Sequence, residues 1–241
     1  MKYSVYVEGQ SEMLFITDLL SKYSGYDPTL CGYSCINLRA NQHEYRSHPI
    51  QGDMDSRHYY QVINVNNDEL VVSKIKNSLS DLAKKGFELI IGLRDVYGEN
   101  YKKLNKNRPT VNWDLIIRML ETQNRELNSN SLPVKLHFAI MEFEAWLIAL
   151  MKTNRSMNAA ELEIMSQSAG LDNTQNVEEI FHPSVKLKSM LQTIDKTYDK
   201  KEGDVQSILS RIGKEEYEEL RISGMSPSFT TFATTLLQPF I

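Results

Sequence analysis

The first 150 residues alternate between short apolar runs and stretches whose apolar residues recur at helical spacing. The runs are rich in β-branched and aromatic residues, which favour strands. The strands predicted in this way are residues 2–7, 31–38, 61–65, 87–95 and 132–140, and the helices are 13–20, 68–85, 112–127 and 144–150. Alternation of strand and helix predicts an α/β fold with a mostly parallel sheet flanked by helices.

The first strand leads directly into a helix. Gly9 permits the sharp turn, and Ser11 is the expected N-cap of the helix. Ligands of parallel α/β sheets bind beyond the carboxyl ends of the strands. Glu8 would therefore stand at the edge of a binding crevice, with Glu12 one helical turn away.

Residues 152–241 contain no comparable strand, and their sequence predicts helices. Helices are predicted at 159–169, 184–197, 203–212 and 229–237, a loop at 173–176, and a solvated helical face at the acidic run 214–219. We expect a core at residues 1–151 with a basic and aromatic insertion at 39–60, and a helical C-terminal region at 152–241 that packs on this core.

The composition is that of an ordinary globular protein. Hydrophobic residues make up 41% and charged residues 24% of the 241 residues. Two cysteines, no apolar leader and no run long enough to cross a bilayer predict a cytoplasmic protein without membrane contact. A net charge of −4 argues against a surface covered in basic residues, although local basic patches remain compatible with it.

Three predicted strands end on a carboxylate, namely Glu8, Asp95 and Glu142. Acids brought together repel one another unless a cation neutralises them, and oxygen ligands favour Mg²⁺ or Mn²⁺ over zinc. Glu12 and Glu144 are further candidate ligands. Glu142 and Glu144 have an alternative role, because an acid near a helix N-terminus stabilises the helix dipole.

Basic residues gather in two segments that could contact phosphates. The candidate nucleic-acid contacts are Arg39, Arg46 and Arg57 in the insertion, and Lys102, Lys103 and Arg108 after the strand that ends at Asp95. A solvated insertion and an exposed linker are the alternatives. Cys31 and Cys35 with His43 and His48 could form a zinc site, but their spacing is shorter than that of zinc fingers and favours free thiols.

Several of these segments resemble a known family. Val7-Glu-Gly-Gln-Ser-Glu12 is similar to the signature of TOPRIM domains, especially those of OLD-like nucleases and of uncharacterised bacterial relatives. Leu93-Arg-Asp-Val-Tyr-Gly98 and Met141-Glu-Phe-Glu-Ala-Trp-Leu147 resemble the Asp-x-Tyr-Gly and Glu-Phe-Glu-Ala elements of those relatives. The segments 182–188, 198–200 and 226–229 resemble their later motifs, so the resemblance spans nearly the whole chain.

The resemblance implies that residues 1–151 form a TOPRIM core with a Rossmann-like parallel sheet, and that the protein is a metal-dependent nuclease acting on DNA or RNA. Glu8 would be the general acid/base or a metal ligand, and Asp95 and Glu12 would be metal ligands. Lys186, Lys188 and Lys200 would be catalytic lysines by their place in the motifs. Two departures are that Tyr97 replaces the second acid of the TOPRIM Asp-x-Asp and that Met141 stands where many relatives carry His.

Relatives resembling this chain are often encoded beside ABC- or SMC-like ATPases in anti-phage defence cassettes. The resemblance therefore implies an ATPase partner and a role as a defence effector, since the chain has no Walker A motif of its own. The alternative is a degenerate TOPRIM module that binds an ATPase or a nucleic acid without cutting.

Overall fold

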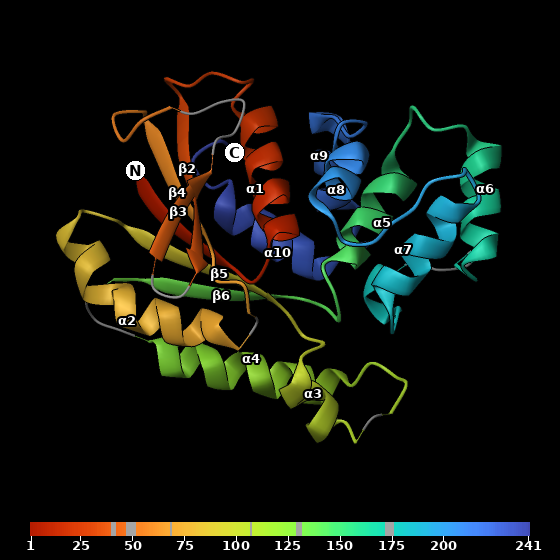
Figure 1. Cartoon of the computed structure of the whole chain (residues 1–241), viewed down its shortest axis with the longest axis horizontal. Coiled ribbons are helices and arrows are strands. Elements are labelled where there is room, and N and C mark those ends of the chain that lie inside the picture. Colours follow the sequence, from red (N-terminus) through yellow and green to blue (C-terminus); the bar gives the residue numbers. More distant parts are fainter. Residues whose placement is uncertain (40–41, 47–51, 68, 107, 129–131, 172–175) are drawn as a thin grey trace.

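One six-stranded sheet runs through the molecule between two layers of helices (Figure 1). The computed structural model describes residues 1–39, 42–46, 52–67, 69–106, 108–128, 132–171 and 176–241, and describes only the backbone of Arg39 and of residues 42–46. The strands are β1 (Lys2–Val7), β2 (Cys31–Arg39), β3 (Gln42–Arg46), β4 (His58–Asn64), β5 (Leu89–Asp95) and β6 (Val134–Ala139). The order is β3-β2-β4-β1-β5-β6, in which five strands are parallel and β3 pairs antiparallel with β2. The predicted α/β fold is confirmed.

Helix α1 and the helical C-terminal region cover one face of the sheet. Side chains of β1, β5 and α1 share one continuous hydrophobic core with the helices after β6. Those helices are α5 (Glu144–Thr153), α6 (Ala159–Ser168), the short η1 (Val177–Glu179), α7 (Pro183–Gln192), α8 (Glu202–Leu209), α9 (Lys214–Ser223) and α10 (Pro227–Leu236). Whether residues 1–151 and 152–241 act as two domains stays a prediction.

Three helices cover the opposite face, below the sheet in Figure 1. They are α2 (Leu70–Lys84), α3 (Glu99–Leu104) and α4 (Trp113–Leu127). Their apolar residues form a second core with the alternate side chains of the same strands, as the two-residue period of a strand requires. Among the described residues, no helix is long and apolar enough to cross a bilayer.

The connections place the topological switch point of the sheet, where open α/β sheets have their ligand crevice, between β1 and β5. These two strands are parallel neighbours, and Val7 pairs with Leu93 near their carboxyl ends. Strand β1 continues into α1 (Gln10–Tyr23) on one face of the sheet, whereas β5 continues into α3 on the other. Such a reversal of direction opens the usual ligand site of open α/β sheets. Glu8 and Asp95 lie at this point.

Some local predictions are wrong. The insertion 39–60 is partly sheet, because β3 pairs with β2 and β4 already begins at His58. Helix α1 begins at Gln10 with Gly9 as its N-cap, so Ser11 is inside the helix. The basic run 101–108 begins inside α3, where the fully buried Tyr101 joins the core. By contrast, the helical face predicted at 214–219 is confirmed: the run lies in α9, its acids are exposed or half-buried, and Tyr217 between them is buried.

Candidate metal centre

Three carboxylates meet at the crevice between β1 and β5. Glu8 follows the last residue of β1, Glu12 lies in the first turn of α1, and Asp95 is the last residue of β5. One oxygen of each side chain lies within 4.8 Å of the others, close enough for all three to hold one metal ion. The prediction that acids distant in sequence converge here agrees with the structure.

Backbone donors fix two of these carboxylates. The N–H of Asp95 donates to Glu8 Oε2 at 2.9 Å, and the N–H of Phe143 donates to Asp95 Oδ1 at 2.8 Å. The second bond connects the end of β5 to the segment that follows β6. Both carboxylates therefore keep defined positions without any cation, as a preorganised site requires.

Glu12 is the most deeply placed acid of the three. Its side chain is 6% exposed, and Oε2 is buried with no hydrogen-bond partner among the described residues. Its carboxylate packs against Gly9, where an added Cβ would stand 2.7 Å from Oε2. A side chain at position 9 would therefore displace the Glu12 carboxylate from its present position. A buried carboxylate oxygen without a donor is costly, and a bound cation would compensate it.

The acids oppose one another's ionisation. Burial, followed by the charge of Glu8, raises the pKa of Glu12 to about 8. Burial, followed by the charges of Glu8 and Glu12, also raises the pKa of Asp95 well above its usual range. A divalent ion would remove both the desolvation cost and the repulsion, so the donor set fits an oxygen-preferring cation such as Mg²⁺ or Mn²⁺.

Glu142 and Glu144 lie outside this group of three. Ser184 donates to Glu142 from its N–H at 3.0 Å and from its hydroxyl at 2.8 Å, so Glu142 accepts at the N-terminus of α7. The Nζ of Lys200 lies 3.4 Å from Glu142 and 3.1 Å from Glu144. Glu142 therefore stabilises a helix N-terminus, which is the alternative role that the sequence offered for it. That helix is α7, however, and not the helix that follows Glu142 in the chain.

The C-terminal region thus supplies a cation to the acidic site. Burial alone would lower the pKa of Lys200, but the charges of Glu144, Glu142 and Asp95 outweigh it and raise that pKa above its ordinary value. Tyr198 is buried and donates to Glu144 Oε1 at 2.9 Å. Ser184 and Tyr198 were not among the predicted site residues, although both lie in segments that carry the family resemblance.

Of the three candidate lysines, Lys200 is the one whose described contacts reach the acids. Lys188 pairs with Asp199 at 2.8 Å on the surface. The amino group of Lys186 lies next to Gly170, beyond the end of α6. Catalytic roles for Lys186 and Lys188 stay predictions without a described contact to the site.

The basic candidates are spread over the molecule. Arg57 precedes β4, at the amino edge of the sheet, and a strand of this length places it about 20 Å from the acids. Lys102 and Lys103 lie on α3, which follows Asp95 directly, and Arg108 is exposed beyond that helix. The side chains of Arg39 and Arg46 lie outside the described part.

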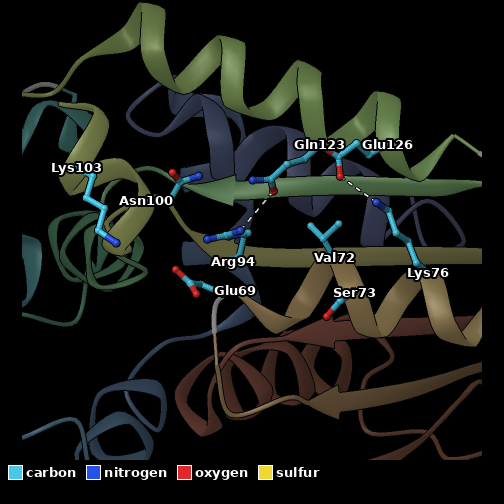
Figure 2. A pocket seen from close by; sticks show the side chains of 9 residues that line it. All are labelled: Glu69, Val72, Ser73, Lys76, Arg94, Asn100, Lys103, Gln123 and Glu126. Atoms are coloured by element: carbon cyan, nitrogen blue, oxygen red, sulfur yellow. Dashed lines mark hydrogen bonds and ion pairs between the residues drawn. The ribbon is translucent and has the colours of Figure 1, made fainter.

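A polar cleft of about 430 Å³ lies on the other face of the sheet, between α2, α3, α4 and the end of β5 (Figure 2). Arg94 enters it because neighbouring residues of a strand point to opposite faces, so Arg94 and Asp95 diverge. Arg94 Nη1 donates to Gln123 at 3.4 Å, and Lys76 pairs with Glu126 at 2.9 Å. Lys103 and Lys76 line the same cleft, so three cations border it.

The surroundings of Cys31 and Cys35 do not support the alternative of a zinc site. Cys31 and Cys35 are buried in the hydrophobic core, where burial raises the pKa of each thiol to about 12. A zinc ligand must be a thiolate, which such an environment opposes. The side chain of His43 and all of His48 lie outside the described residues.

Comparison with known proteins identifies a family. The domain of unknown function DUF4276 matches residues 7–237, a stretch that includes every acid discussed above. Curated proteins and solved structures gave no match. The match covers most of the chain, from the end of β1 to the end of α10. This chain therefore belongs to the family described as domain of unknown function DUF4276.

Proposed function

We propose that this protein is a Mg²⁺- or Mn²⁺-dependent nuclease that hydrolyses phosphodiester bonds in DNA or RNA. The observation that carries the proposal is the group of Glu8, Glu12 and Asp95 at the carboxyl ends of two parallel strands, where one buried Glu12 oxygen has no donor in the described part of the chain. Enzymes of this architecture place their ligand at this edge of the sheet.

The resemblance to TOPRIM nucleases supports the choice of reaction. Glu8, Glu12 and Asp95 come from the two motifs of that resemblance, and they converge in space. Tyr97, the third residue of Asp95-Val-Tyr97, stands where TOPRIM domains have a second acid, so the site that we propose holds one ion in the group of three acids. Glu142 and Glu144 belong to a neighbouring network with Lys200.

When bound, a divalent ion would stabilise negative charge on the phosphodiester and increase the acidity of an attacking water. Glu8 and Asp95 would hold it through oxygens that the backbone already positions. Lys200 would place a positive charge beside the same crevice, where it could stabilise the charge that develops on the substrate. Tyr198 would hold Glu144 and thereby keep Lys200 in place.

Arg94 and Lys103 are the cations that we propose for contacts to the substrate backbone, because both line one cleft close to the end of β5. An ABC- or SMC-like ATPase partner, and a role in anti-phage defence, are also part of the proposal. They follow from the resemblance alone.

The direct test is incubation of the purified chain with DNA and RNA in Mg²⁺, Mn²⁺ or EDTA, alone and with an ATPase encoded beside it. Asp95→Asn and Glu8→Gln should abolish metal-dependent cleavage. Glu121→Gln, an equal change on the exposed face of α4, should leave it intact. Binding without cleavage in every condition would favour a degenerate module and would overturn the enzymatic proposal.

A further inference from the structure

Three aromatic side chains cluster beside the acids. The ring of Tyr97 meets that of His182 edge to face at 4.8 Å and that of Phe181 at 5.5 Å. The Nζ of Lys102 lies 4.7 Å from the centre of the Tyr97 ring. All three aromatic residues are partly exposed, whereas the neighbouring Tyr101 is fully buried in the core. The cluster therefore has rings and a cation within reach of solvent.

The backbone places this aromatic cluster next to Asp95 and next to the segment that carries Glu142. Tyr97 follows Asp95 by two residues, so their Cα atoms are at most about 7.6 Å apart. The backbone N–H of Tyr97 donates to the carbonyl of Met141 at 2.8 Å, which ties it to the turn before Glu142. His182 is the N-cap of α7, the helix whose Ser184 binds Glu142.

Aromatic rings beside cations are the usual contacts of unpaired bases. Each base has a flat face that stacks on such a ring, and a lysine over the ring adds electrostatic attraction to the site. In a duplex the neighbouring base pairs already cover these faces, so a ring can stack only on a base that is unpaired or turned out. A site that stacks one base on such a ring would therefore favour single-stranded over double-stranded substrate.

We propose that Tyr97 and His182 stack an unpaired base next to the phosphodiester held at the acids, so that the substrate is single-stranded nucleic acid at that point. This inference rests on the proposed function. Tyr97, which stands where TOPRIM domains have a second acid, would thus bind the substrate and not the metal.

The test uses the full chain carrying Asp95→Asn, which binds substrate without cutting it. Affinity is measured by fluorescence anisotropy with labelled 20-nucleotide single strands of DNA and RNA and with the matching duplexes. A second single strand carries 2-aminopurine, whose fluorescence falls when it stacks. We expect the single strands to bind more tightly than the duplexes and the 2-aminopurine to be quenched. Tyr97→Leu and His182→Leu should each weaken single-strand binding about 5- to 150-fold, the range for loss of one base–aromatic stack.

Tyr97→Phe should keep the affinity, since the ring remains. Tyr26→Leu, which removes an exposed ring from the turn after α1, should change nothing. Circular dichroism checks that each variant is folded, and His182→Leu tests the inference should Tyr97→Leu fail to fold. Equal affinity for single strands and duplexes, or unchanged affinity in a folded Tyr97→Leu or His182→Leu, would overturn the stacking site while metal-dependent cleavage by the unmodified chain still upholds the nuclease. Absence of both binding and cleavage would overturn both proposals.

Discussion

Replacement of Glu12 by glutamine should stabilise the metal-free protein at neutral pH. The folded chain holds Glu12 with a pKa raised from 4.5 to about 8, mainly by burial and then by Glu8. Between these two values the folded state binds a proton that the unfolded state has lost. The free energy of unfolding therefore falls as the pH rises through this window. Glutamine imitates the protonated acid at every pH, so Glu12→Gln removes this loss.

The size of the effect follows from the same pKa values. With 1.36 kcal/mol per pKa unit, the full difference between 4.5 and 8 is at most about 5 kcal/mol. At pH 7.5 about 4 kcal/mol of it is lost, and at pH 5 less than about 1 kcal/mol. The variant should therefore exceed the unmodified protein in stability at pH 7.5 by up to about 4 kcal/mol and nearly equal it at pH 5.

Urea denaturation in EDTA at the two pH values measures this difference. Repetition in Mn²⁺ should reverse the order, because an ion that binds only the folded state stabilises the protein with the intact site. A Glu12→Gln protein that is less stable than the unmodified chain in EDTA at pH 7.5 would refute the reasoning. So would an undiminished stabilisation by Mn²⁺.

Gly9→Ala should weaken Mn²⁺ binding about tenfold in titration calorimetry, because the added methyl group meets Glu12 at 2.7 Å; unchanged affinity would contradict the close approach. Lys200→Met should lower the rate of hydrolysis about 100-fold or more, while Lys201→Met at an exposed neighbour has no effect; equal rates would remove Lys200 from the site. Burial, aided by the charge of Lys135, lowers the pKa of His137 to about 4. The free energy of unfolding should therefore fall by about 3 kcal/mol as the pH drops from 6.5 to 4, because the unfolded state gains a proton there that the folded state does not. Urea denaturation of His137→Leu should show a smaller fall over the same pH range.

The sheet was predictable because its strands carry strong local signals. Residues 89–93, just before Arg94 and Asp95, are an unbroken apolar run apart from Gly92, and all of β5 is buried. The missed elements lack such signals. Strand β3 is polar and exists through its pairing with β2, and α3 has only six residues, too few to show a helical period. The start of α1 was also missed, because its N-cap is Gly9, which has no side chain to mark the position.

The candidate site was predictable where topology alone decides it. Carboxyl ends of parallel strands share one edge, so Glu8 and Asp95 had to approach each other. The separation of Glu142 and Glu144 from the group of three depends on contacts with Ser184, Tyr198 and Lys200, which come from a different part of the chain. No local pattern reports such contacts. The cleft lined by Arg94 was likewise hidden, because it forms only when three helices pack around one strand.

The central claim is that Glu8, Glu12 and Asp95 together hold one divalent ion. Crystals grown or soaked in Mn²⁺ test it most directly, because manganese can be located by its anomalous scattering. The account predicts a single strong peak between the three carboxylates, about 2.1 Å from an oxygen of Glu8 and of Asp95, and its loss in Asp95→Asn. A saturating concentration of Mn²⁺ that leaves this position without a peak, or a peak held by other residues, would contradict it.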